Sequence, residues 1–218
     1  MINILYNKKR SIPKKYETIR SNYSSIATKG FDIVSNQFSL HYYFKNEKTL
    51  RTYLENISNA CKKGGYFIGT CYDGNRILEL FGDKNVIEYT KNSETVYKLE
   101  KIDISDFKYN KENIKNMFGN SINVYMDSIG KTFEEYLVHF EFFIDIMKEY
   151  GFILDIPKNS NKFINKSIDS FESILRNLSK LKEDKELDTY YKNSINILTD
   201  ENLYNLSKTN NYFIFKKK

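Results

Sequence analysis

Hydrophobic positions in the first half of the chain predict a strand, a helix and a second strand. Residues 31–38 (FDIVSNQF) are apolar and β-rich, which is typical of a buried strand. Residues 47–63 predict a helix that ends at Gly64-Gly65, because glycine tolerates the left-handed position after a helix. Its apolar residues share one face: Leu50, Tyr53, Leu54, Ile57 and Cys61. Residues 66–72 (YFIGTCY) predict a second buried strand, so the order indicates a parallel βαβ unit.

The second half of the chain also mixes strand and helix patterns. Polar–apolar alternation over residues 86–104 predicts a hairpin around Asn92-Ser93. An amphipathic helix is predicted from Phe133 to Tyr150, after a strand at residues 122–130. The remaining predicted elements are a turn at Asp73-Gly74-Asn75 into a short helix, a helix capped by Ser170, and a last strand at residues 211–217. Together these patterns favour an α/β fold.

Charge and composition add two open questions. The net charge is +6 with a pI near 9.0, and basic residues cluster at Lys8, Lys9, Arg10, Lys14 and Lys15. This balance fits a polyanionic partner such as RNA, and it fits equally a solvated surface that keeps the protein soluble. Cys61 and Cys71 have no CxxC or His pair nearby, which indicates reduced core thiols in an intracellular protein. No stretch is apolar enough to predict a membrane span.

Four segments, in order, resemble the mRNA cap guanine-N7 methyltransferase family. Residues 31–44 end in the family's Q-x-x-x-H-Y-x-F pattern, and residues 60–77 carry a Gly-Gly before a strand. The T-C-x-D-G turn in the second segment is similar to versions found in large DNA viruses. Residues 118–152 contain E-Y-L-V followed by Y-G-F, and residues 206–218 contain a terminal N-Y-F-x-F. The resemblance runs from about Phe31 to the end of the chain.

This resemblance implies an incomplete class I (Rossmann-like) S-adenosylmethionine-dependent methyltransferase fold. We expect a mixed, mostly parallel sheet flanked by helices, with the N-terminal strands missing. Residues 1–30 would be a basic segment in place of the usual cofactor-binding half, and residues 31–218 the C-terminal part of the domain. The family pattern departs in two places: no D-x-G-x-G loop occurs, and Tyr23-Ser24-Ser25 stands where the family has Asp-Ser-Ser.

The resemblance also implies roles for five residues. Gln37 and Tyr42 would border S-adenosyl-L-methionine, the methyl donor. His41, Glu135 and Tyr212 would bind the cap guanine. Without the resemblance, each has an ordinary structural interpretation: Glu135 as a solvated charge on a helix, His41 as a buried structural histidine and Tyr212 as a core residue. His139 is interpreted as packing.

Methylation at guanine N7 requires no general base, because this nitrogen has a free lone pair and no proton to lose. Holding N7 in line with the methyl carbon supplies most of the rate, so we expect neither a catalytic nucleophile nor a metal. The predicted function is therefore cap guanine-N7 methyl transfer on capped mRNA. The alternative is a non-catalytic cap- or RNA-binding or stimulatory subunit, or a gene fragment, that lacks the cofactor loop. Another polypeptide could supply the N-terminal half, and the site of action would be intracellular: host cytoplasm or virion for a viral protein, nucleus for a cellular one.

Overall fold

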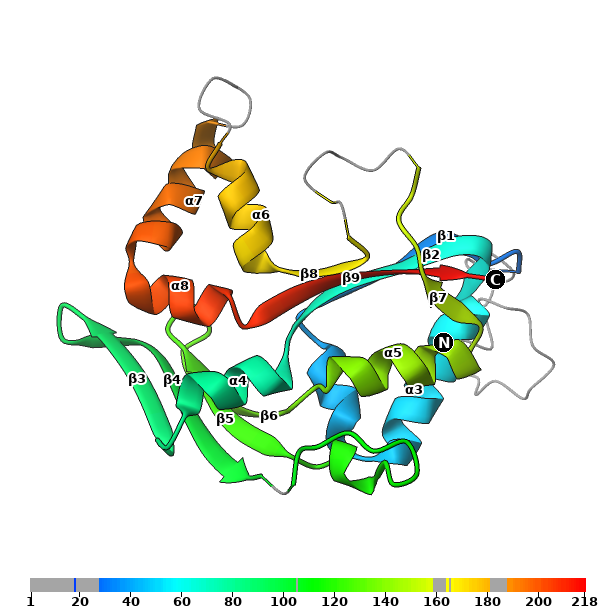
Figure 1. Cartoon of the computed structure of the whole chain (residues 1–218), viewed down its shortest axis with the longest axis horizontal. Coiled ribbons are helices and arrows are strands. Elements are labelled where there is room, and N and C mark those ends of the chain that lie inside the picture. The colour runs from blue at the N-terminus through cyan, green and yellow to red at the C-terminus, as the bar shows by residue number, and fades with distance from the viewer. Residues whose placement is uncertain (1–17, 19–27, 105, 159–163, 165, 181–187) are drawn as a thin grey trace.

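The computed structural model describes residues 18, 28–104, 106–158, 164, 166–180 and 188–218. Residues 1–17 and 19–27, and with them the basic cluster and Tyr23-Ser24-Ser25, lie outside the described residues. The described strands form one sheet of five strands and another of four, with helices around them (Figure 1). The proposed boundary at residue 30 stays a prediction.

The five-stranded sheet contains the predicted βαβ unit. Its order is β1-β2-β9-β7, with β8 also paired to β9; the bounds are β1 (Phe31–Gln37), β2 (Cys61–Tyr72), β7 (Phe152–Leu154), β8 (Ile168–Ser170) and β9 (Asn210–Lys217). Strands β1 and β2 are parallel neighbours, which confirms the unit. The other pairs in this sheet, β2–β9, β7–β9 and β8–β9, are antiparallel. The sheet is therefore mixed as expected, but the expectation that it is mostly parallel is wrong for the described strands.

The connection between β1 and β2 runs through η2 (Leu40–Lys45) and α3 (Glu47–Ala60). Asn46 caps α3, because its side-chain oxygen accepts a hydrogen bond from Thr49 N at 2.9 Å. The helix ends at Ala60 and β2 begins at once, so Gly64-Gly65 lies inside the strand and does not end the helix as predicted. Gly64 has φ +75°, a value that suits an irregularity near the start of the strand.

Strand β1 is more exposed than its apolar sequence predicts. Phe31 is 40% exposed and Ile33 is 59% exposed, and Asn36 is the one buried residue of the strand. The physical reason is position: among the described strands β1 pairs with β2 alone and forms the edge of the sheet. The prediction of a buried strand is therefore corrected to an edge strand.

The four-stranded sheet is antiparallel throughout. Its strands are β3 (Val86–Lys91), β4 (Glu94–Asp103), β5 (Ser121–Met126) and β6 (Lys131–Tyr136), paired in that order. Asn92 and Ser93, between β3 and β4, have φ values of +54° and +67°. These values are those of a tight hairpin turn, so the predicted hairpin is confirmed.

The helix predicted from Phe133 to Tyr150 is partly wrong. Residues 131–136 pair along their whole length with β5, and the helix α5 (Phe140–Glu149) begins only after His139. Gly130, with φ +69°, closes the turn that brings β6 back along β5. The hydrogen bonds of this hairpin override the helical spacing of the apolar residues, so Glu135 lies on a strand and not in the first turn of a helix.

The other helices frame the two sheets (Figure 1). They are α4 (Gly74–Phe81), η3 (Lys115–Met117), α6 (Phe171–Leu178), α7 (Asp188–Thr199) and α8 (Glu201–Ser207). Asp73 caps α4 by accepting from Asn75 N at 3.0 Å, which confirms the predicted turn. Ser170 occupies the position before α6 as predicted, but its side chain makes no capping hydrogen bond.

A core rich in phenylalanine joins β2, β9 and α5. The Phe213 ring centroid lies 5.1 Å from that of Phe67 and 5.3 Å from that of Phe143. Gly69 gives this contact its room, since a Cβ atom there would clash with the Asn36 carbonyl oxygen and the Phe213 ring. The core thereby fixes the carboxyl end of β2, where Cys71 and Tyr72 line a cavity.

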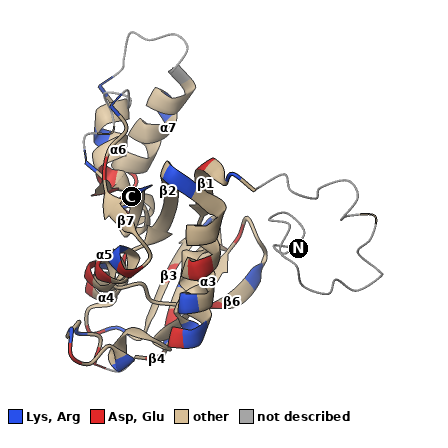
Figure 2. Ribbon diagram, turned by 90° about the vertical axis from the view of Figure 1, so that its right-hand side faces the viewer, with Lys and Arg blue, Asp and Glu red and all other residues tan. Residues whose placement is uncertain are grey.

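Surface charges on the helices are mostly mixed in sign. Figure 2 shows basic and acidic residues side by side on α3 and α5. Arg51 joins the two helices, with nitrogens 2.6 Å from a Glu47 oxygen and 2.8 Å from a Glu149 oxygen. This arrangement is typical of an ordinary solvated surface.

Candidate functional site

One cavity of about 410 Å³ lies beside the carboxyl end of β2. The four-stranded sheet supplies its apolar wall through Leu99, Ile122, Val124, Met126 and Phe133. Residues of β2, η2, α4 and α6, and of the connection from α8 to β9, also line it, as do Phe38 and Ile129. The volume is in the range of small-molecule sites, and the wall suits a flat ligand.

Glu135 is the carboxylate of this cavity. It stands on β6 opposite Ile122 of β5, and both residues face the cavity. Side chains alternate along a strand, so the neighbouring Glu134 faces the other way and does not line the cavity. The Glu135 side chain is 14% exposed, which places a carboxylate in a largely apolar surrounding.

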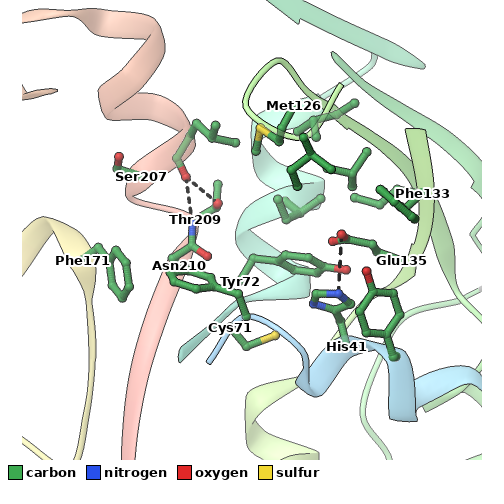
Figure 3. A pocket seen from close by; sticks show the side chains of 18 residues that line it. His41, Cys71, Tyr72, Met126, Phe133, Glu135, Phe171, Ser207, Thr209 and Asn210 are labelled. Carbon is green, nitrogen blue, oxygen red and sulfur yellow. Dashed lines mark hydrogen bonds and ion pairs between the residues drawn. The ribbon is translucent and has the colours of Figure 1, made fainter. Parts of the chain in front are cut away.

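The side chain of His41, which belongs to η2, lies next to the Glu135 carboxyl group. Its Nε2 lies 3.5 Å from Glu135 Oε1, and its side chain is 5% exposed (Figure 3). The imidazole stacks on Tyr72, with ring centroids 5.3 Å apart and planes 9° apart, and meets Tyr42 edge-on at 4.2 Å. At 3.5 Å the contact with Glu135 is longer than a hydrogen bond, and neither ring nitrogen has a hydrogen-bond partner among the described residues.

Burial shifts both titratable groups toward their neutral forms. It raises the pKa of Glu135 to about 7, an effect that a hydrogen bond from Tyr72 partly offsets. Burial lowers the pKa of His41 to about 4. At neutral pH the imidazole is therefore neutral, so the pair is not a salt bridge, and Glu135 changes its charge in the neutral pH range. A perturbed carboxyl group and an unpaired imidazole inside a cavity are typical of a ligand site.

This arrangement can recognise a planar base with two adjacent N–H donors. An ionised carboxylate has two oxygens that accept hydrogen bonds and none that donates. The guanine N1–H and exocyclic amine form such a donor pair, whereas adenine presents an acceptor at N1. Tyr42, Tyr72 and Phe133 supply aromatic surface around the carboxylate.

The structure brings three of the five predicted site residues together. Three of them line the cavity: His41, Tyr42 and Glu135. Tyr42 is 43% exposed. Gln37 lies at the exposed end of β1, where its Oε1 accepts from Thr70 Oγ1 at 2.8 Å, and it does not line the cavity. Tyr212 is 7% exposed, stands between Thr70 and Asp169 in the sheet, and does not line the cavity either.

Sequence reasoning missed several lining residues. Asn210, two residues before Tyr212, lines the cavity with Ser207 and Thr209 (Figure 3). Tyr72 is the variable residue of the T-C-x-D-G turn, so the motif gave no signal for it. Cys71 lines the cavity, and burial raises the pKa of its thiol. Cys61 and Cys71 are both free and buried, as the prediction of reduced core thiols requires. His139 packs against Phe107 and Tyr109 and caps the start of α5, as the packing interpretation requires.

Comparison with known proteins decides the family. The model of the mRNA (guanine-N(7))-methyltransferase domain matches residues 9–204. The chain belongs to this family. The match begins before Phe31, so it includes part of the segment that the motifs above did not reach.

Named relatives agree with this assignment. The chain is similar to the mRNA cap guanine-N(7) methyltransferases of Candida albicans, at 30% identity over 73% of this chain and 34% of that protein, and of Meyerozyma guilliermondii, at 31% identity over 78% of this chain and 29% of that protein. It thus spans about a third of the length of these relatives. Both are fungal proteins and leave the large-DNA-virus type a prediction. An S-adenosylmethionine-dependent methyltransferase from Clostridium acetobutylicum gives a TM-score of 0.44 at 16% identity, over 87% of this chain and 59% of that one, which is too low to add to the argument.

Membership in the cap methyltransferase family agrees with the α/β architecture and the helix-flanked mixed sheet. Within the described residues, no helix is long and apolar enough to span a membrane. The same residues contain no cluster of three or more His, Cys, Asp or Glu side chains suited to a metal ion.

Proposed function

We propose that this chain binds the cap guanine of mRNA and takes part in its methylation at N7, with S-adenosyl-L-methionine as the methyl donor. The observation that carries the proposal is the carboxylate of Glu135, held beside the imidazole of His41 in an aromatic cavity. Capped mRNA is accordingly the proposed substrate, and the proposed site of action is inside the cell.

Glu135 selects guanine in this proposal. Its two oxygens accept from N1–H and from the exocyclic amine, and each charge-assisted bond contributes more than a neutral one. The neutral His41 ring, whose nitrogens have no hydrogen-bond partner among the residues that the structure describes, can donate one hydrogen bond and accept another. Methyl transfer places positive charge on the guanine, and an ionised Glu135 at its edge stabilises that charge.

The methyl donor would lie near Gln37 and Tyr42. Gln37 ends a parallel strand, and ligands of open α/β sheets bind at the carboxyl ends of such strands. The amide of Gln37 and the partly exposed side chain of Tyr42 fit the border of a donor site. The bound donor supplies an electrophilic methyl group, which N7 accepts while the sulfonium sulfur becomes a neutral thioether. Nothing in the 218 residues supplies the D-x-G-x-G loop that holds this donor in the family pattern.

A binding assay followed by a transfer assay tests the proposal. The chain is titrated with the dinucleotide caps GpppG and ApppA, then incubated with GpppG and S-adenosylmethionine at millimolar concentration. We expect tighter binding of GpppG, and N7-methylguanine detected by mass spectrometry. Equal affinity for the two caps contradicts the guanine site. Guanine-selective binding without transfer favours the alternative, a cap-binding or stimulatory subunit.

A further inference from the structure

Tyr72 stands on a backbone that is held on both sides. It is the last residue of β2, where it pairs with Asn210 of β9. Asp73 follows at once and caps α4. The Tyr72 side chain is 9% exposed and lines the cavity. A side chain on such a fixed backbone can hold its neighbours in place.

The hydroxyl of Tyr72 reaches β6 at two successive residues. It donates to the Tyr136 carbonyl oxygen at 3.0 Å, and the Glu135 carboxyl group is a second acceptor for it. Figure 3 shows the Tyr72 ring pointing toward Glu135. A phenol has one proton to donate, so the two acceptors compete for it. An ionised carboxylate forms the stronger hydrogen bond, and the proton therefore turns to Glu135 when that group is charged.

The ring of Tyr72 makes a separate contact with His41. The two rings stack with their centroids 5.3 Å apart and their planes 9° apart. This stack supports the imidazole whose Nε2 lies 3.5 Å from the Glu135 carboxyl group. Phenylalanine at position 72 would keep the stack and lose the hydroxyl, so the two contacts can be tested separately.

The other titratable groups that face Glu135 are uncharged at neutral pH. Burial lowers the pKa of His41 to about 4 and raises the pKa values of Tyr42 and Cys71. Strand β5 presents apolar side chains to the cavity. Of the groups that the structure describes around Glu135, only Tyr72 lowers the pKa of its carboxyl group, against the larger effect of burial.

We propose that Tyr72 is a positioning residue for guanine recognition, whose hydroxyl keeps the Glu135 carboxylate ionised and directed at the guanine edge. This inference rests on the proposed function and adds to it. A carboxylate has about four lone-pair positions, so one bond from Tyr72 leaves both oxygens able to accept from guanine. A hydrogen bond to the charged form favours that form, which offsets part of the cost of burying the charge.

Tyr72→Phe tests the proposal, because it removes the hydroxyl and keeps the ring. The affinity of the full chain for GpppG is measured by calorimetry from about pH 6 to about pH 9. In the unmodified chain the affinity should rise with pH, with a midpoint near the pKa of Glu135, about 7. In Tyr72→Phe the midpoint should move up by about one pH unit, since a hydrogen bond to the charged form is lost. Binding of GpppG should then be roughly tenfold weaker below the midpoint, and this loss should shrink as the pH rises.

Tyr97→Phe is the matched control. Tyr97 is also buried, its hydroxyl donates to the Asn202 carbonyl oxygen at 3.4 Å, and it does not line the cavity. The same atom is removed, so the midpoint should stay near that of the unmodified chain. Glu135→Gln has no carboxyl group to titrate, and adding Tyr72→Phe to it should leave the pH profile flat.

An unchanged midpoint in Tyr72→Phe, or an equal shift in Tyr97→Phe, overturns the positioning role of Tyr72. Tighter binding of GpppG than of ApppA by the unmodified chain would in that case still support the proposed function. Equal binding of the two caps by the unmodified chain contradicts the proposed function, and the role of Tyr72 with it.

Discussion

The Nε2 atom of His41 and the Oε1 atom of Glu135 lie 3.5 Å apart, although the two residues come from different layers of the molecule. His41 follows the edge strand of the five-stranded sheet, whereas Glu135 belongs to the antiparallel sheet. Folding therefore builds the site at the junction of these layers, and the state of one carboxyl group governs its chemistry.

Cap binding should increase with pH. Burial raises the pKa of Glu135 to about 7, and the carboxylate must be ionised to accept two hydrogen bonds. The affinity for GpppG should rise about tenfold from about pH 6 to about pH 8, because the competent fraction rises by that factor. Glu135→Gln should bind weakly with a flat pH profile in fluorescence or calorimetric titrations. A pH-independent affinity in the unmodified chain would show that Glu135 does not contact the ligand.

Stability should depend on pH through the same two residues, with opposite signs. The raised pKa of Glu135 makes the folded state bind more protons between pH 4.5 and about 7, so this group stabilises the fold at lower pH and loses that contribution as pH rises through 7. The lowered pKa of His41, from 6.5 to about 4, acts in reverse, and stability is lost as pH falls through this window.

Glu135→Gln removes the first effect and leaves the second. Its free energy of unfolding should therefore fall more steeply with acid between about pH 6.5 and 4.5, by up to ~1.4 kcal/mol per pH unit relative to the unmodified chain. Urea unfolding at several pH values measures this difference. Parallel curves for the two proteins would contradict the buried setting of Glu135.

Gly69→Ala should destabilise the fold. A Cβ atom there would meet the Asn36 carbonyl oxygen and the Phe213 ring, so the β1–β2–β9 core must shift. We expect a loss of about 1–3 kcal/mol in the free energy of unfolding. Gly64→Asn is the matched control, because no atom lies within 4 Å of a Cβ at that position and asparagine tolerates positive φ. Equal stability of the two variants would refute this register of the sheet.

The 218-residue chain by itself should bind S-adenosylmethionine weakly. It contains no D-x-G-x-G loop, and Gln37 and Tyr42 can only border the donor. Calorimetry at millimolar donor should give a dissociation constant well above about 1 μM. Micromolar affinity would mean that residues 1–30 hold the donor in a way that their sequence does not reveal.

Local patterns predicted the elements whose geometry is set by neighbours in sequence. The parallel βαβ unit, the turn at Asp73-Gly74-Asn75 and the hairpin around Asn92-Ser93 all follow from short-range spacing. The helical spacing of Phe133, Leu137 and Phe140 predicts a helix at Glu135. The pairing of β6 with β5 is a tertiary interaction that this spacing does not encode.

Only the site residues that belong to sequence motifs could be predicted from the sequence. The Q-x-x-x-H-Y and E-Y-L-V segments led to His41, Tyr42 and Glu135, which the fold brings together. Tyr72 and Asn210 gave no signal, because their role depends on which strand ends meet at the cavity. Tyr212 lies in the predicted last strand but does not line the cavity. Its predicted contact with guanine stays a prediction.

Guanine selection by Glu135 is the central claim, and the ratio of GpppG to ApppA affinity tests it most directly. The measurement compares the unmodified chain with Glu135→Ala, and with Glu134→Ala as the control, since Glu134 is the adjacent carboxylate on the opposite face of β6. Loss of two charge-assisted hydrogen bonds should weaken GpppG binding at least about tenfold, at ~1.4 kcal/mol per decade. Glu135→Ala should bring the ratio close to one, while Glu134→Ala should leave it unchanged. A ratio of one in the unmodified chain, or an unchanged ratio in Glu135→Ala, would contradict the account.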